Sequence, residues 1–238
     1  MIVAVIPARG GSKRIPRKNI RDFCGKPMIA WSIETAKASA LFDRIIVSTD
    51  DDEIAAVAQH HGAEVPFRRP AELADDHAPT VPVIAHALMQ IGIRDSADKA
   101  CCIYPTAPLL QAEDLIRGYR RLNEGGLDYV FGVTHFPYPI QRAFRLRDDG
   151  LVEMFHPENY GARSQDLVPA YHDAGQFYWG TSEAWLSEKQ LFLSQATGVV
   201  LPRSRVQDID NPEDWAFAEI LMRGTIAGAA DVSVDIRH

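Results

Sequence analysis

One stretch near the start of the sequence decides the fold: Ile2-Val-Ala-Val-Ile-Pro-Ala-Arg-Gly-Gly-Ser-Lys-Arg-Ile-Pro-Arg-Lys-Asn19. Residues 2–6 are apolar at every position and mostly β-branched, which predicts a strand buried on both faces of a parallel sheet. The glycine-rich, basic segment that follows is then the loop at the carboxyl end of this strand. Ligands of open α/β sheets bind at that edge, so this loop is a candidate binding site.

Strands and helices alternate along the chain beyond this loop. Apolar periodicity predicts strands at 44–48 and 100–104 and helices at 27–38, 49–61, 81–91 and 112–123. Two short strands, at 176–180 and 198–201, and a closing helix at 212–222 complete the pattern. From residue 224 onward the periodicity is weak, so we expect no regular structure there. The alternation is typical of an α/β fold with a largely parallel sheet.

The pattern changes between residues 129 and 155, where extended runs are interrupted by Pro137, Pro139 and an Asp148-Asp149-Gly150 turn. This predicts a hairpin excursion that is an arm and not part of the core. An arm at 136–160 without a core of its own is the kind of element that packs on a second subunit. Nothing else in the composition divides the chain, so we expect one domain spanning residues 1–238.

The overall composition is that of an ordinary globular protein. The chain has 238 residues, of which 46% are hydrophobic and 24% are charged, which excludes disordered, collagen-like and coiled-coil chains. Three cysteines without CxxC spacing predict neither a disulfide framework nor a thiolate zinc site, and they favour a cytoplasmic location. The first apolar run is far shorter than the about 20 residues of a membrane span, so we expect neither export nor membrane insertion.

Charge is concentrated in one region. The net charge of −7 argues against a nucleic-acid or membrane partner, yet residues 9–26 hold seven cations and one anion, a local charge of +6. Within this region Gly10, Gly11 and Ser12 allow the backbone amides to point at one anion, and Arg9 and Lys13 are among the cations around it. A triphosphate fits that description. The loop contains neither GxGxxG nor a Walker motif.

A second candidate is the sequence Asp208-Ile209-Asp210. On an extended segment, residues two apart face the same side, so both carboxylates point one way while Ile209 packs on the other side. Two carboxylates that face a triphosphate predict a Mg²⁺ site. The alternative is helix capping, but Asn211 before Pro212 explains a cap without either aspartate. Similarly, the acidic run at 49–53 favours capping of the helix that follows it.

These motifs resemble those of the cytidylyltransferases that activate acidic nine-carbon sugars. The resemblance begins with the loop at 7–20 and spans about the first 220 residues, through Phe42–Asp50, Arg69–Ala74, Pro105–Pro108 and Asp208–Asp210. It implies a Rossmann-like, GT-A-like nucleotidyltransferase with a mostly parallel sheet and a β-rich dimerisation arm. The implied activity joins CTP to a nonulosonic acid, releases pyrophosphate and needs Mg²⁺. The resemblance also implies a homodimer whose arms reach toward the partner's active site.

The resemblance also assigns roles to individual residues. Lys18, Arg9, Asp208 and Asp210 are the implied catalytic residues, with Lys18 stabilising charge on the reacting phosphate and the two aspartates holding the metal. Thr80 is an implied nucleotide contact, although it is also a candidate N-cap of the helix near residue 81. The implied nucleotide-binding residues are Ala8, Arg9, Gly10, Gly11, Ser12, Lys13, Asn19, Arg69, Ala78 and Thr80.

The expected sugar pocket departs from that of the sialic acid synthetases. Those enzymes carry Gln where this chain has Tyr104, and Arg-Pro-Asn-Gly where this chain has residues 172–175, His-Asp-Ala-Gly. At these positions the chain resembles the bacterial pseudaminic acid cytidylyltransferases, which serve surface glycan (flagellin) biosynthesis. We therefore expect Tyr104, Asp173 and Gln176 to bind the sugar, with Asp173 favouring a donor-rich edge. Activation of sialic, legionaminic or Kdo-type acids and a non-catalytic nucleotide-binding regulator remain alternatives, and no general base can be named.

Overall fold

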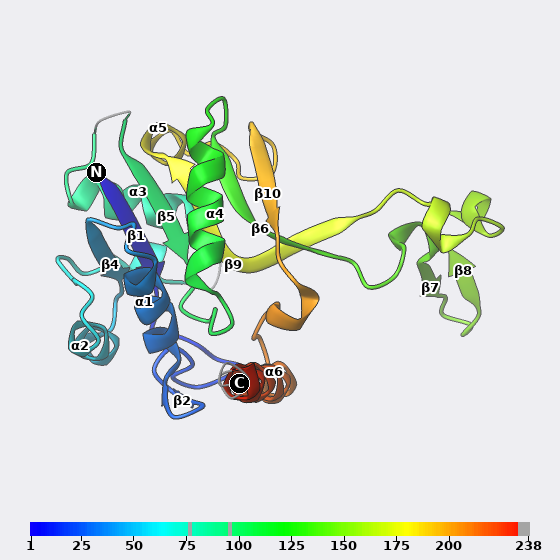
Figure 1. The fold of residues 1–238 in the computed structure, drawn as a ribbon, viewed down its shortest axis with the longest axis horizontal. Coiled ribbons are helices and arrows are strands. Elements are labelled where there is room, and N and C mark those ends of the chain that lie inside the picture. The colour runs from blue at the N-terminus through cyan, green and yellow to red at the C-terminus, as the bar shows by residue number, and fades with distance from the viewer. Residues whose placement is uncertain (76–77, 95–96, 233–238) are drawn as a thin grey trace, which may run out of the picture.

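A six-stranded sheet forms the centre of the molecule (Figure 1). The computed structural model describes residues 1–75, 78–94 and 97–232. Strand β9 pairs antiparallel with its neighbours β5 and β6, whereas every other pair in the sheet is parallel. The predicted α/β class with a mostly parallel sheet is therefore confirmed. The strand order is β10-β6-β9-β5-β1-β4, with β1 at Ile2–Pro7, β4 at Arg44–Ser48, β5 at Lys99–Ile103, β6 at Tyr129–His135, β9 at Tyr171–Thr181 and β10 at Ala196–Val200.

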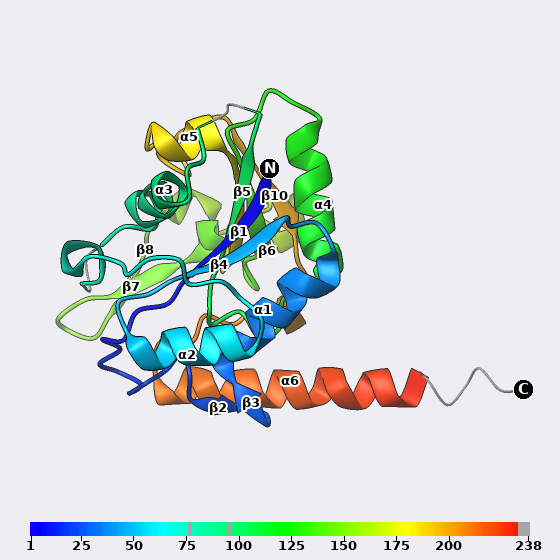
Figure 2. The ribbon, with the colours of Figure 1, turned by 90° about the vertical axis from the view of Figure 1, so that its left-hand side faces the viewer.

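Helices cover both faces of this sheet (Figure 2). Side chains alternate along β1, so that Ala4 and Ile6 pack with α1 and α4 on one face, while Val3 and Val5 pack with α3 and α5 on the other. All four side chains are fully buried, which is the pattern expected for a strand covered on both sides. The helices are α1 at Met28–Ser39, α2 at Asp52–His60, α3 at Thr80–Gln90, α4 at Ala112–Asn123 and α5 at Ser182–Leu186.

A third hydrophobic cluster lies outside the sheet and joins the basic loop to the C-terminal part of the chain. Ile15 of the loop, Phe23 of β2 (Asp22–Phe23) and Ile209 are all fully buried in it. Phe23 meets the ring of Trp215, on helix α6 (Pro212–Val232), edge to face at a centroid distance of 5.3 Å. The short strand β3 (Lys26–Pro27) pairs with β2. This cluster holds the loop and the Asp208–Asp210 segment side by side.

The extended run at 129–135 belongs to the core. These residues form strand β6, whose Tyr129 and Val130 are fully buried between β9 and β10, so the interpretation of this run as part of the arm is wrong, whereas the bounds 136–160 begin where β6 ends. The predicted hairpin itself is confirmed as β7 (Phe144–Leu146) and β8 (Val152–Met154), which stand away from the body of the molecule (Figure 1). Short 3-10 turns at Ile140–Arg142, Pro157–Asn159 and Ser164–Asp166 flank the hairpin.

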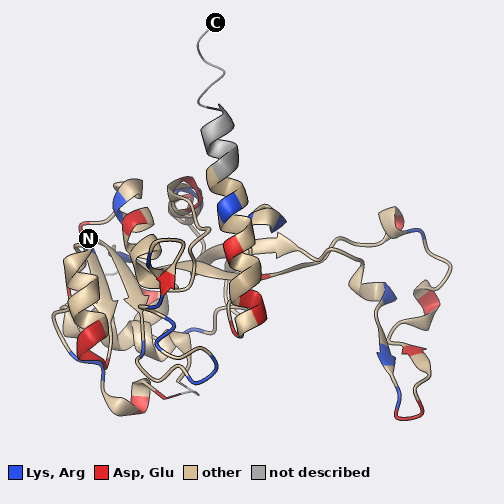
Figure 3. Cartoon of the chain, turned by 90° about the horizontal axis from the view of Figure 1, so that it is seen from below, with Lys and Arg blue, Asp and Glu red and all other residues tan. Residues whose placement is uncertain are grey.

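Charges of both signs lie on the arm (Figure 3). Arg145 pairs with Glu153 across the hairpin at 3.1 Å, and Arg163 pairs with Asp166 at 2.8 Å. Both pairs are exposed and contribute little to stability. The contact of the arm with a second subunit stays a prediction.

Helix α6 is longer than predicted, because it continues through Gly224 to Val232. A single glycine inside a helix costs about 1 kcal/mol relative to alanine, and the alanine-rich sequence around it favours the helix. The expectation that the chain is irregular from 224 onward is therefore wrong for residues 224–232, while its remainder, 233–238, lies outside the described residues. None of the helices in the described part of the chain is long and apolar enough to cross a membrane.

Candidate active site

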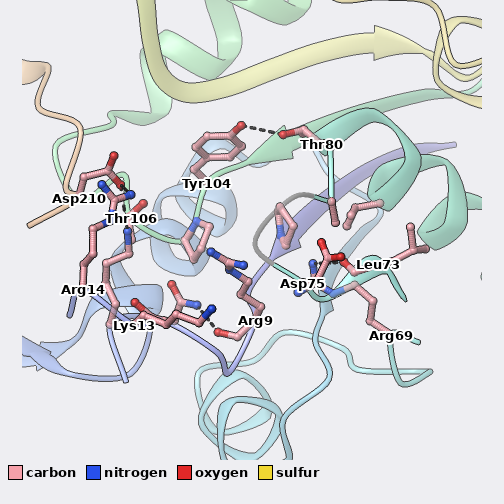
Figure 4. A pocket seen from close by; sticks show the side chains of 17 residues that line it. Arg9, Lys13, Arg14, Arg69, Leu73, Asp75, Thr80, Tyr104, Thr106 and Asp210 are labelled. Carbon is pink, nitrogen blue, oxygen red and sulfur yellow. Dashed lines mark hydrogen bonds and ion pairs between the residues drawn. The ribbon is translucent and has the colours of Figure 1, made fainter. Parts of the chain in front are cut away.

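A pocket of about 550 Å³ opens at the carboxyl ends of β1 and β5 (Figure 4). Its walls come from the loop after β1, the segment after the 3-10 turn η1 (Ala71–Leu73), the start of α3, the residues after β5 and Asp210. We call it the nucleotide pocket. It lies at the edge of the sheet where the sequence predicts a binding site.

Internal hydrogen bonds fix both ends of the basic loop. The amide of Ala8 donates to the carbonyl of Ser48 at 3.0 Å, which ties the start of the loop to β4. The side chain of Asn19 is buried and donates to the carbonyl of Arg9 at 2.9 Å, which closes the loop on itself. Because its ends are fixed, the loop presents the side chains between them to the pocket in one arrangement.

Residues at the start of α2 form hydrogen bonds with the same loop. The Gly10 amide donates to Asp50 at 3.0 Å, and the Arg17 guanidinium forms two hydrogen bonds to Asp51, at 2.6 and 3.0 Å. Asp51 also accepts the Ile54 amide at 2.9 Å as the N-cap of α2, so the capping interpretation of the acidic run is confirmed. The hydrogen bonds from Arg17 hold the pKa of Asp51 below its ordinary value.

The backbone of the loop does not point at an anion in the predicted way. The Gly10 amide is taken by Asp50, and the Ser12 amide donates to the Gly10 carbonyl at 3.0 Å. The prediction that these two amides are directed at a ligand is therefore wrong for this structure. The positive side of the pocket is formed by side chains, with Arg9, Lys13 and Arg14 among them (Figure 4).

Most residues predicted to bind nucleotide or to act in catalysis line this one pocket. Ala8, Gly10 and Gly11 do not line it, since Ala8 is buried beneath the loop and the glycines shape its backbone. Arg14 and Thr106 line the pocket without having been predicted, although Arg14 lies inside the basic motif. The predicted residues that the structure brings together here are Arg9, Ser12, Lys13, Lys18, Asn19, Arg69, Ala78, Thr80 and Asp210.

Lys18 connects the loop to the aspartate segment. Its ammonium donates to the carbonyl of Ile209 at 2.6 Å and lies 3.8 Å from the carboxylate of Asp210. Burial lowers the pKa of Lys18, although the nearby carboxylates oppose this effect. Arg14 reaches the same Asp210 carboxylate at 3.0 Å from a more exposed position. The positive loop and the acidic segment therefore meet at Asp210.

The two aspartates line adjoining pockets. Ile209 is fully buried between them, which confirms that it packs away from the carboxylates. Asp210 faces the nucleotide pocket, whereas Asp208 lines a neighbouring cavity of about 570 Å³, which we call the second pocket. Partial loss of hydration, together with the charge of Asp210, raises the pKa of Asp208. The two carboxylates therefore lie close enough for the charge of one to affect the ionisation of the other, while they line different pockets.

A divalent cation fits this donor set. Mg²⁺ takes one or two carboxylates and completes its shell with phosphate oxygens and water, and the Asp208–Asp210 segment borders a pocket rich in cations suited to phosphate. In the described residues no group of three or more His, Cys, Asp or Glu side chains could hold a metal alone. The aspartates are not needed for capping, since Asn211 accepts the amides of Glu213 and Asp214 at 2.8 and 3.0 Å.

Arg69 and Thr80 form the far wall of the nucleotide pocket. Arg69 is buried and donates to the carbonyl of Ser48 at 3.1 Å, and burial lowers the pKa of its guanidinium. The N-cap of α3 is Pro79, so the reading of Thr80 as the cap is wrong. The Thr80 hydroxyl instead forms a hydrogen bond with the Tyr104 hydroxyl at 2.8 Å. Burial raises the pKa of Tyr104 to about 12, so the phenol stays neutral.

The predicted sugar residues are neighbours but do not line one pocket. The Tyr104 amide donates to the Gln176 carbonyl at 2.9 Å, and the Tyr104 ring lies 5.2 Å from that of Tyr178, which donates to Asp173. Tyr104 lines the nucleotide pocket and Asp173 lines the second pocket, whereas Gln176 is buried, lines neither pocket and donates to the Arg205 carbonyl at 2.5 Å. The pairing of β9 with β6 is irregular between Asp173 and Tyr178. Asp173 spans this irregularity by accepting from the Gly175 amide at 3.0 Å and from the Tyr178 hydroxyl at 2.5 Å.

Comparisons with known proteins agree with this geometry. Residues 3–197 match the family model described as Cytidylyltransferase. The chain is 48% identical to the pseudaminic acid cytidylyltransferase of Campylobacter jejuni over 93% of this chain and 96% of the relative. It is 34% identical to the CMP-N,N'-diacetyllegionaminic acid synthase of Legionella pneumophila, over 93% and 96% of the two chains.

The fold is likewise found among solved structures. That of CMP-2-keto-3-deoxy-manno-octonic acid synthetase complexed with CTP superposes with a TM-score of 0.70 and 18% identity, and it covers 94% of this chain and 99% of the other. The similarity shows that the two chains share the same α/β fold. By the family model and by its relatives, the chain belongs to the cytidylyltransferase family.

Proposed function

We propose that this chain joins CTP to pseudaminic acid, giving CMP-pseudaminic acid and pyrophosphate. The observation that carries the proposal is the nucleotide pocket, in which the basic loop and Asp210 meet in a chain 48% identical to a pseudaminic acid cytidylyltransferase. Another relative, 32% identical, is named a post-translational flagellin modification protein. We therefore place the product in the biosynthesis of bacterial surface glycans such as those on flagellin.

In the proposed reaction the anomeric hydroxyl oxygen of the sugar bonds to the α-phosphorus of CTP. The bond from that phosphorus to the bridging oxygen breaks, pyrophosphate leaves, and the hydroxyl proton is released. Arg9, Lys13 and Arg69 bind the triphosphate as cations. Lys18, held by the Ile209 carbonyl, stabilises charge that redistributes on the phosphates. Because its hydrogen bond fixes the ammonium beforehand, Lys18 needs no reorganisation during the reaction.

We propose Mg²⁺ as the cofactor, held by Asp208 and Asp210 together with phosphate oxygens. When bound, it neutralises triphosphate charge and polarises the reacting phosphate. Burial and, after it, the charge of Asp210 raise the pKa of Asp208, and a cation held by both carboxylates would offset both effects, which supports this proposal.

We also propose a homodimer that forms through the arm, in the cytoplasm. Large apolar side chains on the hairpin are exposed, among them Phe144 (58%), Leu146 (71%) and Val152 (66%). Exposed apolar groups clustered on one element are typical of a protein interface. Leu146→Glu should produce monomers in light scattering, whereas an unchanged mass of two chains would contradict the role of the hairpin.

The proposed function is tested by pyrophosphate release with CTP and a panel of nonulosonic acids, with the product identified by mass. Release with pseudaminic acid, dependent on both substrates, is the expected result. Release with only legionaminic, sialic or Kdo-type acid would change the assigned sugar substrate and leave the proposed cytidylyl transfer unchanged. CTP binding without release for any acid would favour a nucleotide-binding regulator.

A further inference from the structure

The second pocket is lined by negative charges that would repel the carboxylate of the sugar acid. Asp208 lines it, and Asp210, two residues further along the chain, lines the nucleotide pocket, so an acceptor bound near Asp208 would lie close to a triphosphate bound near Asp210. Two carboxylates, Asp173 and Asp208, line the second pocket. A nonulosonic acid carries a carboxylate of its own, and a third negative charge in the same cavity is repelled unless a cation receives it.

Arg203 is placed to supply that cation. It lies on the 3-10 turn η5 (Arg203–Arg205), lines the second pocket and is exposed. Among the residues that the structure describes, no hydrogen bond or ion pair is formed by its side chain. Its neighbour Arg205 differs, because its guanidinium binds both carboxylate oxygens of the buried Asp114. One arginine of the turn therefore anchors it to α4, and the other is left for a ligand.

Part of the lining of the second pocket is apolar. Phe217 and Leu221 of α6 line it together with Pro137, at the base of the arm. A sugar acid that places its carboxylate at Arg203 would direct its remaining substituents toward Asp173, Asp208 and these apolar side chains. The cavity thus combines a cation for a carboxylate with apolar side chains suited to acyl or methyl groups.

We propose that Arg203 binds the carboxylate of the nonulosonic acid, and this inference rests on the proposed function. A guanidinium matches a carboxylate with two parallel N–H donors, which makes the contact directional as well as electrostatic. Arg203 is then a substrate-binding residue that selects acids over neutral sugars. The carboxylate is common to all nonulosonic acids, so the inference holds for whichever acid the wild-type chain accepts.

The test compares Arg203→Gln and Arg203→Lys with Arg120→Gln, an exposed arginine on α4 away from both pockets. Steady-state pyrophosphate release gives KM for the acid and for CTP. Arg203→Gln should raise KM for the acid by about 10- to 100-fold, the size of one charge-assisted contact. KM for CTP should stay within about twofold. Arg203→Lys should recover part of the loss, and Arg120→Gln should match the wild type.

A second substrate, which lacks the free carboxylate, tests whether Arg203 contacts the carboxylate or only supports the structure. The methyl ester of the accepted acid should be a poor substrate for the wild type, but esterification should cost the Arg203→Gln chain little more. An unchanged KM for the acid, or an equal ester penalty in both chains, would overturn the assignment of Arg203. If the wild type releases pyrophosphate with none of the acids, the proposed function fails, and the Arg203 assignment fails with it.

Discussion

Replacing Lys18 by methionine should reduce turnover far more than it weakens CTP binding. Methionine keeps an unbranched side chain of similar size and removes the ammonium that donates to the Ile209 carbonyl at 2.6 Å and lies 3.8 Å from Asp210. Removing one preorganised donor from a reacting centre costs about 10²–10³ in kcat, or about 2.7–4 kcal/mol. A contact that strengthens as charge develops lowers kcat and kcat/KM together.

Arg14→Met is the matched control, because Arg14 reaches the same Asp210 carboxylate at 3.0 Å. The side chain of Arg14 is 67% exposed and that of Lys18 is 19% exposed. Solvent screens the exposed cation, so its loss should raise KM for CTP by a few-fold, about 1 kcal/mol or less, and leave kcat nearly unchanged.

Pyrophosphate release, measured against CTP at saturating sugar acid, separates these two outcomes. Urea unfolding checks that Lys18→Met is folded, since the orphaned Ile209 carbonyl costs about 1–3 kcal/mol. If Lys18→Met raises only KM, or if both variants behave alike, the argument that burial gives Lys18 a catalytic role is wrong.

Three further changes probe the rest of the site and its support. Asp210→Asn should lower kcat/KM by about 100-fold or more, and normal turnover at saturating Mg²⁺ would remove Asp210 from the mechanism. Gly10→Ala puts a Cβ 2.6 Å from the Asp51 carboxylate and should displace the loop. KM for CTP should therefore rise, and an unchanged KM would show that CTP binding does not depend on the contact between the loop and the start of α2. Burial opposes ionisation of Asp114, but its arginine partners outweigh burial and lower its pKa. Ionised Asp114 therefore contributes fully to the stability of the folded protein above the ordinary pKa of an aspartate, about 4. This contribution is lost as the pH falls through the lower pKa that Asp114 has in the folded protein. Asp114→Asn should cost about 3 kcal/mol in urea at pH 7 and less at pH 3, and a pH-independent loss would contradict this.

Local pattern was sufficient to predict much of the fold. The strand at 44–48 and the helix at 112–123 lie where periodicity places them, because their apolar residues repeat with the period of one element. Strand β6 was misplaced because its burial comes from pairing with β9 and β10, which are distant in the sequence. The full length of α6 was missed because the small residues from 224 onward show little apolar periodicity, although the helix continues through them.

The parts of the site that depend on residue type and spacing alone could be predicted from the sequence. A cluster of cations after the first strand and two aspartates two apart required no knowledge of the fold, and the structure brings Lys18 and Asp210 together. The capture of the Gly10 amide by Asp50 depends on two loops meeting in space. Gln176 is buried because its side-chain amide meets the Arg205 carbonyl, a contact between segments 29 residues apart that spacing along one strand does not reveal.

A single competition experiment tests the central claim most directly. The chain is given limiting CTP with Mg²⁺ and an equimolar mixture of pseudaminic, N,N'-diacetyllegionaminic and N-acetylneuraminic acids, and the CMP conjugates are separated and identified against synthetic standards. Products of competition report the ratio of specificity constants. We predict CMP-pseudaminic acid in at least about 100-fold excess over CMP-N-acetylneuraminic acid, about 2.7 kcal/mol at 1.36 kcal/mol per decade. Comparable amounts of the two conjugates would contradict the assignment of pseudaminic acid.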